Sequence, residues 1–142
     1  MFDIQYTKKP SEYSSLSLAY IGDAVYELYV RSRIVNEYPD MPPAKLHITA
    51  IKFVKASAQA EIIKDIFDNL SEREQAVFKR GRNAKSHTVP KNADVTDYRY
   101  ATGFETLIGY LYLSGDEKRL EDIMRSSYEG VSVHIREREH HN

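Results

Sequence analysis

The amino-acid sequence predicts an all-α protein. Glycine is sparse, and no stretch keeps for more than a few residues the alternation of apolar and polar side chains that marks a half-buried strand. Apolar side chains occupy nearly every face of a helix drawn over residues 16–30, which predicts a central helix. The chain has 142 residues and shows no internal repeat or linker, so we expect a single domain over residues 1–142.

The first three helices follow from capping residues and prolines. The first helix is expected to begin near Ser14 or Ser15, either of which can cap it, and to end before the proline-rich turn at residues 38–43. A second helical region starts at Pro43, and Ser57 is expected to cap a third helix.

A short fourth helix and a loop come next. Ser71 followed by Glu74 predicts a capping box, which opens a helix that runs into a basic segment. Turn-forming residues are crowded between residues 81 and 94, so this stretch is expected to form an exposed loop.

The last two helices are predicted in the same way. Thr96 is expected to cap a long helix, with Asp97 stabilising its first turn and Gly115 stopping it. A final helix is expected over residues 116–128. The tail from about residue 130 ends in alternating charges, which indicate a frayed helix.

The composition excludes several classes of protein. Cysteine is absent, so disulfides and thiolate metal sites are excluded. No apolar run has the length that a bilayer requires, and residues 1–10 lack the apolar core of a signal peptide. We therefore expect a cytoplasmic protein that does not enter a membrane. The net charge of −1 argues weakly against a partner bound through overall charge alone.

Two acidic residues stand inside stretches that otherwise have the pattern of packed helix. Asp23 lies in the apolar stretch 16–30, and Glu105 lies in the stretch 100–113. A carboxylate on an apolar helix face is costly unless a cation or a donor satisfies it, so two of them suggest a shared partner. Mg²⁺ accepts one or two carboxylates and several waters, and it can activate a water toward a phosphate. Carboxylates also anchor helices through Arg, Tyr or backbone amides, an alternative that spacing leaves open.

Small residues lie on the same helix faces as the two carboxylates. Gly22 precedes Asp23, and Gly109 lies four residues after Glu105. Such residues leave room for another helix or for an ion with its waters.

Two motifs resemble those of a known family. Residues 18–25, LAYIGDAV, resemble the signature helix of the ribonuclease III family, whose pattern is roughly Leu-Glu-Phe-Leu-Gly-Asp-Ala. Residues 104–113, FETLIGYLYL, are similar to that family's second acidic helix, and the two motifs occur in the family's order. The segment RGRNAK at residues 80–85 resembles one in the compact bacterial branch, Mini-ribonuclease III. The resemblance therefore covers essentially the full length.

The resemblance implies a helical bundle of the ribonuclease III endonuclease-domain type. It further implies a homodimeric endoribonuclease that cleaves double-stranded RNA with Mg²⁺, for which Mn²⁺ can substitute, and leaves a 5′ phosphate and a 3′ hydroxyl. By position in the motifs, Asp23 and Glu105 would be the catalytic metal ligands. The implied natural substrate is a stem in the precursor of large-subunit (23S) ribosomal RNA, and whether ribosomal proteins assist stays open.

The chain departs from the family pattern at the metal site. Leu16, Ala19 and Thr102 stand where the larger enzymes have further acids, so we expect weaker metal binding in the free protein. Glu27 lies one turn from Asp23, but the corresponding family position is not acidic, which makes it a weak candidate for a replacement ligand.

The segment at residues 79–91, KRGRNAKSHTVPK, is basic and contains no acid. A double-stranded RNA offers phosphates and 2′-hydroxyls, which proteins grip largely by shape and charge. The expected RNA contacts are Lys79, Arg80, Arg82, Asn83, Lys85, Ser86 and Lys91, with His87 and Thr88 as further candidates. A charge run is also typical of a merely solvated face, but beside an acidic metal site it favours RNA binding.

Two rival functions fit the same residues. The first is a non-catalytic helical module that binds RNA or dimerises, in which the depleted acidic set marks a lost active site. The second is another helical, metal-dependent phosphohydrolase acting on nucleotides. The histidine-rich metal spacing expected of the second is missing from the sequence.

Overall fold

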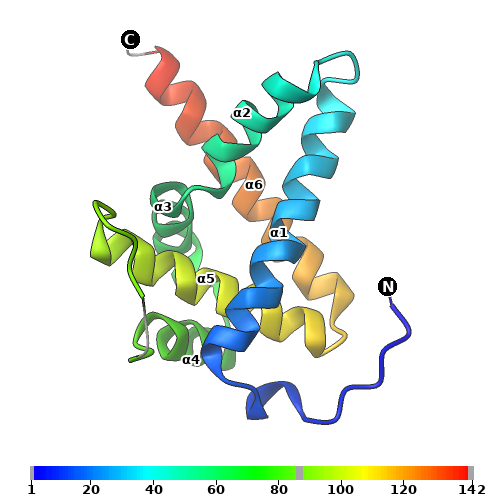
Figure 1. Ribbon diagram of the computed structural model, residues 1–142, viewed down its shortest axis with the longest axis vertical. Helices are drawn as coiled ribbons and strands as arrows, with labels where there is room; N and C mark the ends of the chain where they lie inside the picture. The colour runs from blue at the N-terminus through cyan, green and yellow to red at the C-terminus, as the bar shows by residue number, and fades with distance from the viewer. Residues whose placement is uncertain (1, 86–87, 141–142) are drawn as a thin grey trace.

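The computed structural model describes residues 2–85 and 88–140, which form α-helices and short 3₁₀ turns without a strand (Figure 1). The all-α prediction is confirmed. The α-helices of these residues are α1 (Ser15–Glu37), α2 (Pro43–Val54), α3 (Ala56–Ile66), α4 (Glu72–Arg82), α5 (Val95–Leu113) and α6 (Glu117–His140). None of the described helices combines the length and apolarity needed to cross a bilayer. The single domain over residues 1–142 stays a prediction.

Three predicted helix ends are confirmed. Ser14 caps α1, since its Oγ accepts a hydrogen bond from the backbone N–H of Ser17 at 3.1 Å. Ser71 and Glu74 form the capping box at the start of α4. Gly115 follows α5 with a φ of 74°, a left-handed conformation that glycine adopts without steric cost.

Two predicted helix starts are wrong by a few residues. Lys55, not Ser57, is the N-cap of α3, because the backbone of Lys55 is extended and separates α2 from α3. Asp94, not Thr96, caps α5, because its carboxylate accepts a hydrogen bond from the N–H of Asp97 at 2.9 Å. Aspartate caps a helix at least as well as threonine, so the helix begins at the earlier residue.

As far as the described residues reach, to His140, the C-terminal tail is helix rather than a frayed end, and its first part is packed; residues 141–142 lie outside the described residues. Helix α6 continues to His140, and Val131 on it is only 1% exposed. His134 lies between two acids of α3, with Nε2 2.6 Å from a carboxylate oxygen of Asp65 and Nδ1 3.1 Å from one of Glu61. The prediction of fraying was made from the alternating charges alone. It could not include these contacts with α3, which stabilise the helix.

Helices α1 and α5 cross closely at the centre of the molecule (Figure 1). A Cβ atom at Gly22 would lie 1.8 Å from the backbone oxygen of Glu105, and one at Gly109 would lie 1.9 Å from that of Leu18. The crossing therefore requires glycine on both helices, and it brings the segment around Asp23 against the turn that carries Glu105.

A partly buried ion pair links the start of α4 to the start of α6. Arg119 donates from Nε and Nη2 to the two carboxylate oxygens of Glu74, at 2.8 and 2.7 Å. Glu74 is 6% exposed, and its hydrogen bonds with Arg119 lower its pKa. This pair and the capping box fix the start of α4, whose other end carries the basic residues.

Candidate active site

Asp23 on α1 and Glu105 on α5 open into the same cleft, which has a volume of about 340 Å³. The two acids come from distant parts of the chain and meet because α1 and α5 cross at glycine. The described residues that line the cleft are Leu16, Ala19, Tyr20, Asp23, Thr88, Tyr98, Thr102 and Glu105.

The two acids differ in burial. Glu105 is half-buried between helices, as the sequence predicts, whereas Asp23 is exposed and lies outside the packed interior. The reason is that α1 turns Gly22 and Tyr26 toward the core, which leaves Asp23 at the edge of the packed face. Although apolar residues occupy nearly every face of α1, one face of this helix is therefore left unpacked.

The environment suppresses the charge of Glu105. Burial, followed by the hydrogen bond and the negative charge of Asp23, raises the pKa of Glu105 to about 9. The charge of Glu27 raises it further, although the Glu27 carboxylate is itself paired with Arg31 at 2.7 Å. A hydrogen bond from the Gln59 side chain acts in the opposite direction. The cleft therefore holds two carboxyl groups that do not ionise together without a compensating cation.

This donor set fits a divalent cation. Among the described residues that line the cleft there is no lysine or arginine, so no side chain of the lining neutralises the two carboxylates. The sequence left open that arginine anchors these two acids, but no arginine lines the described part of the cleft. Two carboxylates with room for waters match the preference of Mg²⁺.

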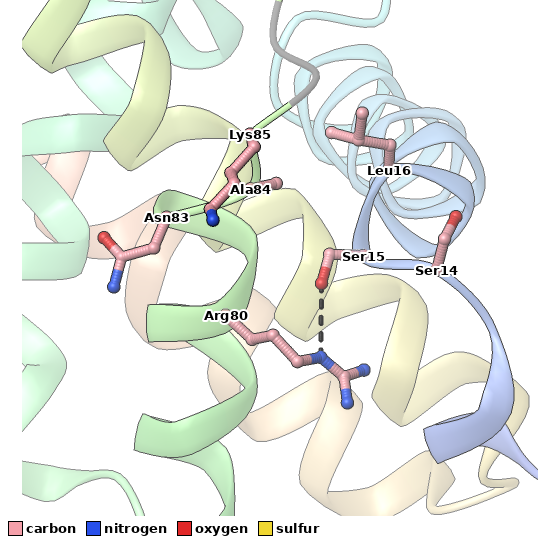
Figure 2. Close-up of a pocket in the computed structure, with 7 residues that line it drawn as sticks. All are labelled: Ser14, Ser15, Leu16, Arg80, Asn83, Ala84 and Lys85. Carbon is pink, nitrogen blue, oxygen red and sulfur yellow. Dashed lines mark hydrogen bonds between the residues drawn. The ribbon is translucent and has the colours of Figure 1, made fainter.

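A second, basic pocket of about 500 Å³ adjoins the acidic cleft, and Leu16 lines both. Figure 2 shows Arg80 of α4 reaching across to the start of α1, where its Nε donates a hydrogen bond to the Oγ of Ser15 at 3.2 Å. Asn83 and Lys85 also line this pocket, although the Asn83 side chain points to the opposite side of α4.

The comparisons with known proteins show the family of the chain. The family model for the ribonuclease III domain matches residues 16–116, which include both acids of the cleft and the basic end of α4. The chain belongs to the ribonuclease III family. Its relatives include the Mini-ribonuclease 3 of Clostridium tetani, 52% identical over 85% of this chain and 81% of the relative. That of Thermoanaerobacter sp. is 53% identical over 83% and 82%.

A solved structure supports the same fold. A crystal structure of a Fusobacterium nucleatum protein superposes with a TM-score of 0.76 at 31% identity, covering 87% of this chain and 98% of that one. The resemblance to the Mini-ribonuclease III branch is thereby confirmed. This ribonuclease III family member is an endoribonuclease.

The family's missing acids map onto the cleft itself. Leu16, Ala19 and Thr102, which replace acids of the larger ribonuclease III enzymes, all line it beside Asp23 and Glu105. The Thr102 hydroxyl donates to the backbone oxygen of Tyr98 at 2.9 Å, so it serves the helix. Within the described part of the chain, no group of three or more His, Cys, Asp or Glu side chains could hold a metal ion.

The sequence predicted that the basic residues lie on an exposed loop. In the structure only some of them do. Lys79, Arg80 and Arg82 lie in the last turn of α4, and Asn83 is its C-cap. The helix extends this far because its glycine, Gly81, packs against α5, where a Cβ would lie 2.3 Å from the Thr106 Oγ1.

The remaining predicted contacts differ in environment. Lys85 and Lys91 are exposed on the connection between α4 and α5, as expected. Arg82 is half-buried, with its guanidinium 5.5 Å from the ring centre of Phe78 and 5.6 Å from that of Tyr100. It packs on aromatic rings instead of pointing to solvent. Ser86 and His87 lie outside the described residues.

Gln59 of α3 is the residue at this ribonuclease III site that sequence reasoning missed. It is 1% exposed, its Nε2 donates to the backbone oxygen of Val54 at 3.1 Å, and its amide acts to lower the pKa of Glu105. One sequence feature could have identified Gln59. It lies three residues before Ile62 and four before Ile63, which places a polar side chain on the apolar face of an amphipathic helix.

Proposed function

We propose that this endoribonuclease hydrolyses double-stranded RNA at the cleft of Asp23 and Glu105, using Mg²⁺, and that Mn²⁺ can substitute. The observation that carries the proposal is the convergence of two carboxylates from α1 and α5 in one cleft whose described lining contains no cation. The raised pKa of Glu105 supports it, because a cation is what would allow both carboxylates to ionise together.

Asp23 and Glu105 would hold the metal from two helices. When bound, a divalent cation supplies charge that stabilises the phosphate and lowers the pKa of a coordinated water. The two side chains provide one or two ligand oxygens each, so waters or RNA phosphate oxygens must supply the rest. The apolar and hydroxyl side chains at Leu16, Ala19 and Thr102 add no charge to the lining, which supports weaker metal binding by the free protein than in enzymes with more acids.

The basic end of α4 would hold the RNA backbone beside the cleft. Lys79 and Arg80 are exposed there, and Lys85 and Lys91 are exposed on the following connection. Because Leu16 lines both the basic pocket and the acidic cleft, one RNA strand can contact Arg80 and reach the carboxylates. Phosphates approach two carboxylates only where cations offset the repulsion. Ser86 is retained as a proposed contact from the sequence alone.

The active form would be a homodimer in which each subunit cuts one strand. An exposed apolar stripe on α1 supports this proposal, since Tyr20 is 84%, Leu28 52% and Val35 53% exposed. Beside it lies an apolar groove of about 440 Å³ that includes Ala24 and Leu28 of α1 and Met124 of α6. A two-fold interface needs a self-complementary surface, and a protruding tyrosine next to a groove on one helix is of that kind.

The proposal for the natural substrate is taken from the family resemblance. We propose a double-stranded stem of the 23S ribosomal RNA precursor, with ribosomal proteins as assisting partners.

A cleavage assay tests the proposal directly. The protein is incubated with an end-labelled double-stranded RNA and Mg²⁺, in parallel with Asp23→Asn and with Asp40→Asn, an exposed aspartate in the turn after α1. We expect new 5′-phosphate ends with the wild type and Asp40→Asn, at least a hundredfold fewer with Asp23→Asn, and none with EDTA. Retention of the RNA without new ends would identify a binding module instead, and cleavage by Asp23→Asn at the wild-type rate would refute the assigned site.

A further inference from the structure

The arginine of the basic pocket differs from several other arginines of this protein in what holds it. Arg80 is exposed near the end of α4, and its Nε donates to the Oγ of Ser15 at 3.2 Å (Figure 2). Within the described residues its guanidinium is held by this hydroxyl and by no carboxylate, so its positive charge is left uncompensated. The arginines that pair with an acid are Arg31, Arg33, Arg119, Arg125 and Arg138.

The residue that holds Arg80 is itself fixed by α5. The backbone oxygen of Ser15 accepts a hydrogen bond from the Oγ1 of Thr106 at 3.1 Å, and Thr106 is fully buried. The same Oγ1 lies 2.3 Å from where a Cβ at Gly81 of α4 would stand. Helices α1, α4 and α5 therefore meet at Ser15. Because Thr106 directly follows Glu105, the guanidinium of Arg80 is tied to the turn that carries an acid of the cleft.

The pocket has donors that lack acceptors. The Oγ of Ser15 accepts from Arg80, and in the part of the chain that the structure describes no acceptor takes its proton, although the side chain is only 9% exposed. A buried donor of this kind needs a ligand or a water. The two Nη groups of Arg80 likewise have no described acceptor. The pocket therefore offers O–H and N–H donors, together with the ammonium group of Lys85, to an anion with several oxygens.

The lining of the pocket favours an anion in the same way. Its described residues contain no acid: Ser14, Ser15, Leu16, Arg80, Asn83, Ala84 and Lys85. Leu16 also lines the acidic cleft, so the pocket lies beside the two carboxylates and outside their cleft. An anion bound here is therefore close to the phosphate that the cleft would cleave, but is a different group.

We propose that the basic pocket binds one internal phosphate of the RNA strand, next to the phosphate that is cleaved, and that Ser15 is a positioning residue that orients Arg80 for it. The inference rests on the proposed function, because it names how the same site holds its substrate. Arginine binds phosphate through parallel N–H···O bonds, so its orientation matters. With Nε held by Ser15, less side-chain freedom is lost when the Nη groups bind the phosphate.

Filter binding of a double-stranded RNA in EDTA tests the pocket without cleavage. We expect Arg80→Ala to bind about tenfold more weakly, and the logarithmic salt slope to fall by roughly 0.7–0.9, because one phosphate contact is lost. Ser15→Ala should weaken binding by about threefold, whereas Ser15→Thr keeps the hydroxyl and should bind like the wild type. Wild-type affinity and salt slope in Arg80→Ala would overturn the proposal.

A double variant tests whether Ser15 acts through Arg80. Added to Arg80→Ala, Ser15→Ala should weaken binding by less than about twofold further, since residues that share one interaction are not additive. The full threefold loss in both backgrounds would refute the positioning role. Two controls lie outside the pocket. Ser17→Ala changes an exposed serine in the first turn of α1, and Arg73→Ala changes an exposed arginine in the first turn of α4. Both should keep the affinity of the wild type.

The source of the phosphate is distinguished by the ends of the duplex. The binding measurements use one duplex with 5′-hydroxyl ends and one with 5′-phosphate ends. We expect the loss in Arg80→Ala to be the same on both. A loss confined to the duplex with 5′-phosphate ends would overturn the assignment to an internal phosphate.

Failure of this inference is distinguishable from failure of the proposed function. A wild-type protein that binds RNA through Arg80 and cleaves nothing with Mg²⁺ would refute the cleavage site and support the pocket. Cleavage by the wild type, combined with unchanged RNA affinity in Arg80→Ala, would refute the pocket alone.

A measurement on the wild type covers the case that Ser15→Ala does not fold. The Nε–H resonances of Arg80 and Arg73 are followed by nitrogen-15 NMR while the duplex is added in EDTA. The Arg80 resonance should shift as the RNA saturates the protein, while that of Arg73 stays in place. An Arg80 resonance that does not respond to the RNA would contradict the phosphate pocket.

Discussion

At the residue scale, the candidate site depends on a carboxyl group whose ionisation is opposed by its surroundings. Glu105 has a pKa of about 9 because it is buried and lies against Asp23. At neutral pH and without a cation, the folded protein therefore keeps a proton on Glu105. Binding of a divalent cation must displace that proton, which links the metal affinity of the site to pH.

This linkage has a definite sign. Because the pKa of Glu105 is raised from an ordinary value of 4.5 to about 9, the folded state binds one proton more than the unfolded state between these values. In EDTA we expect the free energy of unfolding to fall as pH rises through this window. Mn²⁺ affinity should instead rise by about tenfold per pH unit below pH 8, since one proton is displaced.

Two titrations check these expectations. Urea unfolding in EDTA at several pH values is compared for the wild type and Glu105→Gln, which has no group to titrate and should show a flatter pH dependence. Mn²⁺ affinity is measured on the wild type over the same range. An affinity that does not change with pH would contradict the suppressed charge of Glu105.

Exposed basic residues are expected to contribute to RNA binding differently from Arg82, which packs on aromatic rings. Replacing Lys79, Arg80 and Lys85 together by Ala should weaken RNA binding and flatten its salt dependence, by roughly 0.7–0.9 in the logarithmic slope for each RNA phosphate that the variant no longer neutralises. Filter binding at several salt concentrations measures the slope. Lys118→Ala on α6 is the control, because the Lys118 side chain is 89% exposed and its pair with Asp122 is worth little.

Arg82 should behave differently from these residues. Its guanidinium lies on Phe78 and Tyr100, so Arg82→Ala is expected to reduce stability more than it reduces the salt slope. A slope change as large as that of Arg80→Ala would mean that Arg82 leaves the aromatic rings when RNA binds.

At the scale of helices, the site is assembled by the crossing of α1 and α5. Gly22 directly precedes Asp23, and the backbone oxygen that a Cβ at Gly22 would meet belongs to Glu105 itself. The contact that brings the two helices together therefore lies at the two acids. Any separation of the helices at this point moves the carboxylates apart.

Gly22→Ala tests this dependence. The new Cβ would lie 1.8 Å from a backbone oxygen that cannot rotate away, so the helices must separate, and we expect a loss of about 3 kcal/mol in unfolding free energy and weaker Mn²⁺ binding. Gly130→Ala is the control, because its Cβ would meet only the terminal methyl of Ile62, at 2.2 Å, which can change rotamer. Its stability should stay within about 1 kcal/mol of the wild type. If the two substitutions lower the unfolding free energy equally, the close crossing of α1 and α5 is not what determines the geometry of the site.

At the scale of the whole molecule, the exposed apolar stripe on α1 indicates where a second copy would sit. Tyr20 lines the acidic cleft and is also 84% exposed, so a partner on this face would lie next to the site. A two-fold axis near α1 would bring two such clefts to one side of the dimer. A duplex with two antiparallel strands suits a pair of sites related by that symmetry.

Tyr20→Asp should therefore convert the dimer to a monomer. A carboxylate placed in an apolar interface must lose its water. The free-energy cost of this desolvation exceeds the free energy gained from the apolar contact that tyrosine makes. Light scattering at several protein concentrations gives the mass, and Val133→Asp, on an apolar residue of α6 that is 41% exposed, is the control. A wild-type protein of monomeric mass at all concentrations would contradict the dimer.

Local features of the chain were sufficient to predict much of the structure. The helical class, the caps at Ser14 and Ser71 and the stop at Gly115 depend on residues within a turn or two of each other, so a single sequence contains them. The pairing of Asp23 with Glu105 was predicted from motifs whose order and spacing resemble those of a family. Gly22 and Gly109 were recognised as small residues beside each acid, and the structure shows that another helix fills the space.

Other properties were decided only by how the helices meet. The sequence by itself determined that this is an all-helical member of the ribonuclease III family with two acids in its motif helices. The tertiary structure decided that Asp23 is exposed while Glu105 is half-buried, that Arg82 packs on aromatic rings, and that α6 continues through the predicted tail. It also buried the polar side chain of Gln59. Helix formation follows from short-range periodicity, whereas burial, pKa and side-chain partners depend on contacts between residues far apart in the chain.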